Sequence, residues 1–388
     1  MIKGFEYLSE KDIYLDSACQ SLRPQPVIDE LTNYYTKHNS CGERVKYKWG
    51  QKTDEKVEAT RLKVLKYLKL SPRTYFVSFT LNTTYGLNLL LNQIHPRFIK
   101  KVITSDIEHN STFLSTMAFG KLHKIKREVL PRRDDGSLPL DGDFTKALVV
   151  VNATSNFDGR TLKNIKALVR KVRKSGGITI IDAAQATAHH KEVLERTTAD
   201  AICFAAHKMY APSLGVMVVR RDLIPQLRTS FIGGGMVDDV FEKSYLLSSE
   251  KPEMAHTIFE PGLQAWGEIC ALGKAIDWLN KAPRSSKKLL WDNCQKLFDF
   301  LQSRAPKVHL INAKPSTNIT FYVEGVDSHL IGEALGDKRI MVRTGYFCAH
   351  YYLDHVKHYP PLIRCSLGYN TRPSDIDALI AALDKVTR

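Results

Sequence analysis

The sequence predicts an α/β protein with a mostly parallel β-sheet and a second, smaller α+β domain. Between residues 101 and 220, short apolar runs alternate with helical stretches, and this alternation is typical of βαβ units. The chain has 388 residues, more than a single core usually supports, and the alternation ends beyond residue 270. Ligands of such sheets bind at the carboxyl ends of the strands, so functional side chains are expected there.

Continuous apolar runs in the middle of the chain predict strands that are buried on both faces. These runs are Lys101–Ser105, Ala147–Asn152, Ile178–Asp182, Ala201–Ala205 and Val216–Arg220. Between the second and the third, Lys163–Lys174 places its aliphatic residues on one helical stripe and its basic residues on the other faces. Gly176 follows this helix, and glycine favours the left-handed turn that ends one.

The C-terminal part of the chain has a different pattern. Asn318–Val323 predicts a strand, and Ile376, Leu379 and Leu383 lie on the buried stripe of a final helix. Ser374 and Asp377 resemble the capping box that starts such a helix. These elements predict a second domain packed on the first.

Composition excludes several classes of protein. Hydrophobic residues make up 43% of the chain, which excludes disorder as the main state, and its apolar runs are far shorter than the ~20 residues of a membrane span. The N-terminus lacks the apolar stretch of a secretory signal, and no two of the seven cysteines form a CxxC pair. We therefore expect a cytoplasmic protein with reduced thiols and neither a metal site nor a disulfide framework.

The formal net charge of +15 allows an acidic partner. The simpler explanation of this charge is that the basic residues lie on solvent-exposed helix faces, since no RNA-binding motif accompanies them. A basic RNA- or protein-binding module on a retired enzyme scaffold is the hypothesis that this charge keeps open.

Two charged residues end successive predicted strands. Asp182 closes one strand, and Lys208 follows the next strand 26 positions later. Taken singly, Asp182 could cap a helix and Lys208 could be one lysine among many. Together they suit pyridoxal 5'-phosphate (PLP), because a carboxylate keeps its ring nitrogen protonated and a lysine binds its aldehyde.

Several motifs then resemble the class V (fold-type I) PLP enzymes, and among them the NifS-like cysteine desulfurases of the SufS type. They occur in the family's order over nearly the whole chain: Tyr14–Ala18, Asn82–Thr84, Ser155–Gly159, Gly233–Met236, Phe259–Gly262, Arg343–Ala349 and Arg364–Leu367. The resemblance implies a homodimer and a seven-stranded, mostly parallel sheet in a large domain, residues 23–270. A small domain, residues 271–388, would carry a cysteine loop and pack with an N-terminal segment, residues 1–22.

The resemblance also assigns roles at the cofactor. Lys208 would bind PLP covalently and then move the substrate's Cα proton, while Asp182 would pair with the ring nitrogen. Gln185 would bond the phenolic oxygen. His109 would stack on the ring and assist proton transfer, although a lone histidine is more often a buried core residue.

Further roles concern the phosphate and the substrate. The resemblance implies that Thr83, Thr84 and His207 hold the phosphate. Arg364 would hold the substrate carboxylate through its guanidinium fork, and Asn156 would face that carboxylate or the cofactor oxygen.

Cys348 is the residue by which the resemblance implies a desulfurase rather than an aminotransferase. Its thiolate would take sulfur from L-cysteine, leaving a persulfide on Cys348 and releasing L-alanine. That sulfur would pass to an acceptor, a small protein or a tRNA-modifying partner. A buried inert thiol is the expected state of Cys203, Cys270 and Cys294, and Cys365 is expected to point away from the site.

The chain departs from the family pattern at two hydroxyl positions. Ala205 and Leu263 stand where the family usually has Ser or Thr hydroxyls near the phosphate. Selenocysteine lyase, or another class V aminotransferase or lyase acting on a different amino acid, therefore remains an alternative to cysteine desulfurase.

Overall fold

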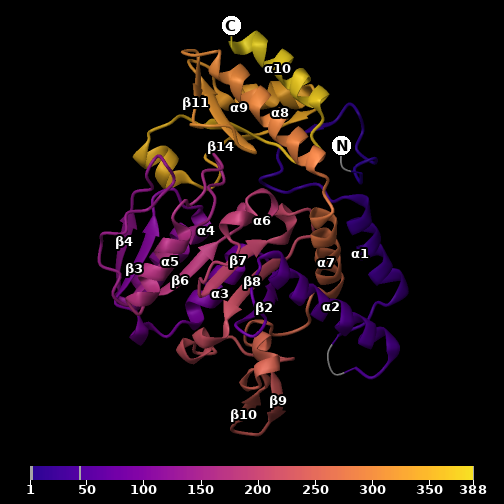
Figure 1. The fold of residues 1–388 in the computed structure, drawn as a ribbon, viewed down its shortest axis with the longest axis vertical. Coiled ribbons are helices and arrows are strands. Elements are labelled where there is room, and N and C mark those ends of the chain that lie inside the picture. Colours follow the sequence, from indigo (N-terminus) through magenta and orange to yellow (C-terminus); the bar gives the residue numbers. More distant parts are fainter. Residues whose placement is uncertain (1–2, 43–44, 388) are drawn as a thin grey trace.

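A seven-stranded sheet forms the centre of the large lobe. The computed structural model describes residues 3–42 and 45–387, so positions 1, 2, 43, 44 and 388 of the predicted domains lie outside it. Figure 1 shows the sheet, with order β2-β8-β7-β6-β5-β3-β4. Its strands are β2 (Tyr75–Thr80), β3 (Lys101–Ser105), β4 (Lys126–Leu130), β5 (Ala147–Asn152), β6 (Ile178–Asp182), β7 (Ala201–Ala205) and β8 (Gly215–Arg220).

The predicted α/β class is confirmed. Strand β8 runs antiparallel to β2 and β7, and the remaining pairs are parallel. Four of the five predicted central strands have the predicted bounds, and the fifth begins one residue earlier.

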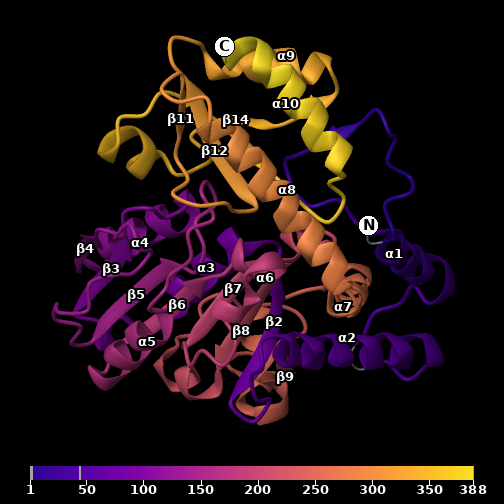
Figure 2. The same ribbon diagram turned by 45° about the horizontal axis from the view of Figure 1, so that its top comes forward.

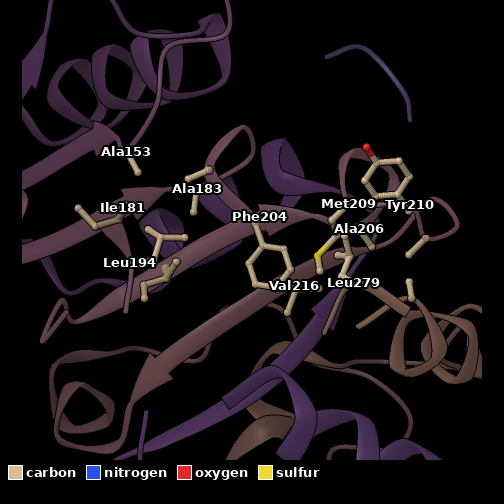
Figure 3. Packing of buried hydrophobic residues seen from close by; sticks show 14 of the residues in the cluster. Ala153, Ile181, Ala183, Leu194, Phe204, Ala206, Met209, Tyr210, Val216 and Leu279 are labelled. Atoms are coloured by element: carbon tan, nitrogen blue, oxygen red, sulfur yellow. The ribbon is translucent and has the colours of Figure 1, made fainter. Parts of the chain in front are cut away.

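Helices cover both faces of this sheet. They include α3 (Thr83–Gln93), α4 (Asn110–His123), α5 (Ile165–Lys174) and α6 (Ala186–His189). Successive residues of β5 point to opposite faces: Val149 and Val151 pack in one core cluster, while Leu148 and Val150 pack in another. Figure 3 shows part of the first cluster, where Ile181 and Phe204 lie among buried side chains.

The amphipathic helix α5 has the predicted buried stripe, formed by Ile165, Leu168, Val169 and Val172. It begins two residues after the predicted start. Gly176 follows it with a φ of +67°, as expected for a residue that ends a helix.

A second, antiparallel sheet lies beyond the large lobe, as Figure 2 shows. Its order is β11-β12-β15-β14, with β11 (Val308–Leu310), β12 (Asn318–Val323), β14 (Arg343–Gly345) and β15 (Leu362–Ser366). The helices of this region are α8 (Arg284–Gln302), α9 (Ser328–Asp337) and α10 (Pro373–Thr387).

The predicted capping box at the last helix is wrong. Helix α10 begins at Pro373, which places Ser374 inside the first turn rather than at the cap. The carboxylate of Asp375 instead accepts a hydrogen bond from the Arg372 backbone N–H, at 2.8 Å.

The N-terminal segment runs beside the second sheet. Its strand β1 (Ile13–Tyr14) pairs in parallel with β13 (Ile340–Met341), and Asp16 forms a bridge to Ser366. Helices α1 (Gln25–Lys37) and α2 (Lys48–Tyr67) pack on α7 (Trp266–Asn280). The predicted boundary after residue 270 falls inside α7, and the domain limits stay a prediction.

A β-hairpin of β9 (Val237–Val240) and β10 (Tyr245–Leu247) projects from the large lobe at the end away from the second sheet (Figure 1). Among the described residues, no helix combines the length and the apolar character that crossing a membrane requires.

A buried ion pair ties α2 to the segment before α7. Two Arg61 nitrogens donate to the two Glu260 carboxylate oxygens at 2.8 and 2.7 Å, and Glu260 also accepts from the Phe79 backbone N–H at 2.6 Å.

Replacing Arg61 with Met leaves the buried carboxylate of Glu260 without its cation, so the free energy of unfolding should fall by about 3–5 kcal/mol. Urea unfolding measures this loss. The double variant R61M/E260L should be more stable than R61M, and a loss below about 1 kcal/mol would contradict the prediction.

Candidate active site

A cavity of about 300 Å³ lies at the carboxyl ends of the central strands. Its walls come from the loops after β3, β5, β6 and β7, the start of α3, the N-terminal segment and the second sheet. All ten predicted site residues line it: Thr83, Thr84, His109, Asn156, Asp182, Gln185, His207, Lys208, Cys348 and Arg364. The structure thus brings together residues from seven separate stretches of the sequence.

Asp182 and Lys208, which carry opposite charges, both line this cavity. Asp182 ends β6, and its carboxylate accepts hydrogen bonds from the Thr112 hydroxyl at 3.1 Å and the Ala184 backbone N–H at 2.9 Å. Burial raises the pKa of Asp182, and those two donors together with the Lys208 ammonium oppose the rise. Burial likewise lowers the pKa of Lys208, against the attraction of Asp182. A carboxylate and an amine with a reduced affinity for its proton therefore share one site.

His109 caps the first turn of α4. Its Nδ1 accepts a hydrogen bond from the Ser111 backbone N–H at 3.0 Å. Burial, with help from the Lys208 and Arg364 cations, lowers the pKa of His109 to about 3. The imidazole is therefore neutral at physiological pH and carries its proton on Nε2, because Nδ1 is an acceptor.

The start of α3 is built to receive an anion. The Asn82 side chain caps the helix by accepting from the Tyr85 backbone N–H at 2.9 Å. Among the described residues, neither Thr83 Oγ1 nor His207 Nδ1, both buried at the cavity, has a hydrogen-bond partner. Burial lowers the pKa of His207 to about 4, so its ring is neutral. Unpaired buried polar atoms are costly, and a phosphate group at this helix N-terminus would satisfy them.

Arg364 lies in the centre of β15 with its guanidinium at the cavity. It donates to Asp16 Oδ1 at 2.9 Å and to the Asn156 backbone carbonyl at 3.0 Å, and it lies 4.8 Å from the centre of the Phe347 ring. Its Nε has no partner among the described residues. The guanidinium is therefore held in one orientation while part of its fork stays available.

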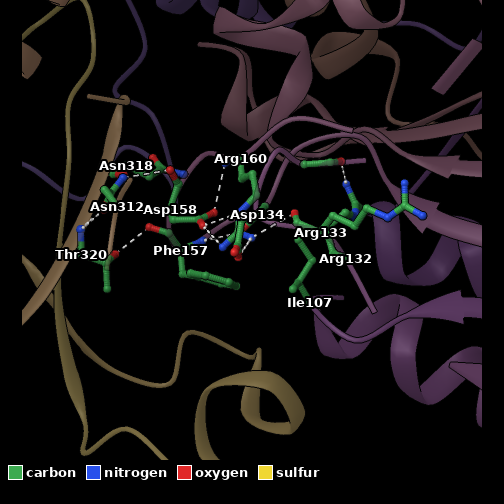
Figure 4. Close-up of polar contacts among 12 residues, drawn as sticks. Ile107, Arg132, Arg133, Asp134, Phe157, Asp158, Arg160, Asn312, Asn318 and Thr320 are labelled. Carbon is green, nitrogen blue, oxygen red and sulfur yellow. Dashed lines mark hydrogen bonds and ion pairs between the residues drawn. The ribbon is translucent and has the colours of Figure 1, made fainter. Parts of the chain in front are cut away.

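Polar contacts from β12 and the segment before it hold the loop of Phe157 and Asp158, as Figure 4 shows, and this loop directly follows Asn156. The Thr320 hydroxyl donates to the Phe157 carbonyl at 2.6 Å, and the Asn312 amide donates to the Asp158 carbonyl at 2.9 Å. The Asn156 amide donates in turn to the Phe347 carbonyl at 2.6 Å, which leaves its Oδ1 buried and unpaired within the described structure.

Gln185 is tied to the N-terminal segment. Its amide nitrogen donates to the Ala18 carbonyl at 2.8 Å, and its oxygen accepts from Asn318 at 3.4 Å. The amide thus lies between the large lobe, the N-terminal segment and β12.

Cys348 is exposed at the cavity, as the sequence predicts. Phe347 and Cys348 both adopt left-handed backbone, with φ of +49° and +59°, and the Cys348 carbonyl accepts from the Asn110 backbone N–H at 2.6 Å. The loop is therefore fixed by its backbone while its thiol stays open. Cys203, Cys270 and Cys294 are buried, as predicted, and Cys365 is also buried and does not line the cavity.

Sequence analysis missed several residues that line this cavity or bond to its lining residues. Asp16 pairs with Arg364 although 348 positions separate them, and Ser111 contacts both His109 and Thr84. Cys19, Asn152, Thr154 and Arg343 also line the cavity. The motif Tyr14–Ala18 contains Asp16, so that residue had a signal in the sequence, whereas Ser111 had none beyond its place two residues after His109.

The two predicted departures lie in different surroundings. Ala205 is buried at the cavity wall, so a hydroxyl is missing there. The side chain of Leu263 is 77% exposed and lies outside the cavity lining.

The chain is similar to known proteins over nearly its full length. The model of the family named Aminotransferase class-V matches residues 13–379. A protein of Haemophilus influenzae named "Probable cysteine desulfurase" is 30% identical over 99% of this chain and 88% of its own length.

Solved structures share the fold. The apo structure of a cysteine desulfurase from Thermococcus onnurineus NA1 has a TM-score of 0.87 at 24% identity, covering 97% of this chain and 95% of its own. A structure of a C-DES mutant with glycine covalently linked to the PLP cofactor has a TM-score of 0.80 at 17% identity, covering 96% of each chain.

The SufS-type assignment stays a prediction. With a family match that spans all but the ends of the sequence and a fold that agrees with it, this chain belongs to the class V aminotransferase family.

Proposed function

We propose that this protein is a PLP-dependent cysteine desulfurase that converts L-cysteine to L-alanine and takes the sulfur as a persulfide on Cys348. One observation carries the proposal: the exposed thiol of Cys348 lines the same cavity as Lys208, Asp182 and Arg364. An aminotransferase needs the amine and the carboxylate, whereas a desulfurase also needs a thiol at hand. The cysteine desulfurases among its relatives support this choice.

The residues at the cavity fit PLP. Thr83, Thr84 and His207 would hold the phosphate, since Thr83 Oγ1 and His207 Nδ1 have no other partner in the described structure. Asp182 would face the ring nitrogen, and Lys208 would bind the aldehyde carbon. When bound, PLP supplies an electron-accepting ring that weakens the bonds at the substrate's Cα.

Arg364 and Lys208 would act on different groups of the substrate, its carboxylate and its Cα proton. Arg364 binds the carboxylate through its free fork positions, and its hydrogen bond to Asp16 holds the guanidinium in place. Lys208 moves the Cα proton. Because burial lowers the pKa of Lys208, a larger fraction of the amine is neutral and able to accept that proton near pH 7.

Cys348 would complete the reaction. Its thiolate attacks the substrate sulfur, so an S–S bond forms while the substrate Cβ–S bond breaks. The electron pair of the broken bond stays on the substrate carbon, which is protonated on the way to alanine. The outer sulfur of the persulfide then passes to an acceptor, and the net charge of +15 favours an acidic one.

Product analysis tests the proposal. The purified enzyme, loaded with PLP, is given L-cysteine, and alanine, pyruvate and released sulfur are measured together. We expect alanine and sulfur in equal amounts and no pyruvate. Pyruvate in place of alanine would make the protein a lyase. Turnover of L-selenocysteine alone would make it a selenocysteine lyase.

The proposal includes a homodimer in the cytoplasm. Exposed apolar side chains on the large lobe, Phe231, Ile232, Phe241, Tyr245 and Leu246, offer a surface that a second copy would cover. Light scattering after gel filtration should give twice the 44.0 kDa of one chain. A mass of one chain would contradict the dimer.

Arg364→Lys should weaken substrate binding. A lysine keeps the charge but loses the planar fork, so KM for L-cysteine should rise about 10-fold or more with a smaller change in kcat. Steady-state kinetics measure both, and Arg343→Lys, at another cavity arginine, is the matched variant. An unchanged KM in R364K would remove Arg364 from carboxylate binding.

A further inference from the structure

Ser111 lies between Thr84, which is assigned to the phosphate, and His109, which is assigned to proton transfer. It is the second residue of α4. Its hydroxyl oxygen is 2.6 Å from Thr84 Oγ1, in the phosphate-binding turn, and 2.9 Å from His109 Nδ1. Its backbone N–H donates to the same Nδ1 at 3.0 Å.

Thr84, Ser111 and His109 form a row of hydrogen-bonded side chains, and the hydroxyl protons in this row can be arranged in two ways. Serine and threonine hydroxyls each carry one proton, and Nδ1 of the neutral imidazole carries none. In the first arrangement, Thr84 donates to Ser111 and Ser111 donates to His109. In the second, Ser111 donates to Thr84, and His109 Nδ1 keeps only the backbone N–H.

A phosphate selects the second arrangement. A phosphate bound at this turn offers acceptors, so Thr84 must turn its single proton toward the anion. The Thr84 oxygen then has a free lone pair but no proton for Ser111, and the Ser111 hydroxyl fills that lone pair.

We propose that Ser111 is a positioning residue that couples the phosphate-binding turn to His109 by turning its one hydroxyl proton from His109 Nδ1 to Thr84 Oγ1 when a phosphate binds. The inference rests on the proposed function, which assigns the phosphate to Thr84 and proton transfer to His109. Its consequence is that Nδ1 loses one of two donors, and the imidazole becomes a better proton acceptor, only in a loaded site.

Other charges near His109 act in both arrangements. Lys208, Arg364 and His350 all disfavour a second proton on the ring, and they lie outside α4. The effect of Ser111 is therefore best measured as a difference between two variants that keep all three groups.

Nitrogen NMR of the histidine side chains tests the coupling directly. The full chain is labelled with ¹⁵N-histidine and freed of PLP, the His109 signals are assigned by their loss in H109Q, and inorganic phosphate is added to saturation. In the wild type, the Nδ1 signal should move toward that of an unprotonated nitrogen with fewer hydrogen bonds. In Ser111→Ala, the movement should be less than half as large, because only the direct field of the anion remains.

Two matched variants separate the hydroxyl from a structural effect. Ser111→Thr keeps a hydroxyl and should restore the wild-type movement. Thr84→Val removes the other end of the row and should reduce the movement as S111A does. An equal movement in wild type and S111A, or no movement in the wild type, would overturn the coupling.

This outcome is independent of turnover. The measurement uses neither substrate nor persulfide, so a failure of Cys348 to accept sulfur would sink the proposed function and leave the NMR result standing. Conversely, a normal desulfurase without the phosphate response would sink the role of Ser111 alone.

Discussion

Lys208→Ala should abolish turnover of L-cysteine and remove the visible absorption band of a lysine-bound PLP. Lys208 is the amine that follows β7 and lines the cavity together with Asp182, and it is assigned both the covalent bond to PLP and the Cα proton. A positioned proton-transfer group alone contributes about 10²–10⁴-fold, so kcat/KM should fall by at least about 10³-fold. Absorption spectra of the purified variant and product assays measure the two effects.

A conservative variant is the control for charge. Lys208→Arg keeps a cation opposite Asp182 but cannot form the covalent bond, so it should fold normally and lack both the band and the activity. Persistence of the band in K208A would show that another lysine binds PLP, and the assignment of Lys208 would be wrong.

Cys348→Ala should stop the release of sulfur while leaving the cofactor spectrum intact. The Cys348 side chain is exposed at the cavity, and its loop is held by backbone hydrogen bonds that alanine keeps. Loss of the attacking thiol should lower sulfur release by about 10²-fold or more. Sulfide assays in the presence of a reducing thiol measure it.

The matched control is Cys41→Ala, since Cys41 is also exposed but lies outside the cavity lining. After reaction with L-cysteine, alkylation and mass spectrometry of the wild type should find the persulfide on Cys348. A persulfide on Cys19, which lines the same cavity, would move the acceptor role to that residue.

The sequence was sufficient for the parts of the site that depend on local pattern. Asp182 and Lys208 follow continuous apolar runs, and parallel strands bring such ends to one edge of the sheet. The bounds of β3, β5, β6 and β7 were predictable for the same reason, since buried strands are apolar throughout.

Contacts between distant segments were not predictable in this way. The pairing of Asp16 with Arg364 requires β1 to lie beside the second sheet, and no pattern within either segment specifies that. The role of Asp375 in place of Asp377 depended on a helix that begins two residues earlier than the capping box predicts. Ser111 has an ordinary helix position, and only the approach of α3 to α4 places Thr84 against it.

The bond between Asp16 and Arg364 has a consequence for biosynthesis. During translation, Arg364 is added to the chain 348 positions after Asp16. The Asp16 carboxylate therefore has no Arg364 to accept from until β15 has been synthesised. Because Arg364 is the group to which we assign the substrate carboxylate, a chain that has not yet reached β15 lacks this binding group even when the strands of the large sheet, all of which precede β15, are complete.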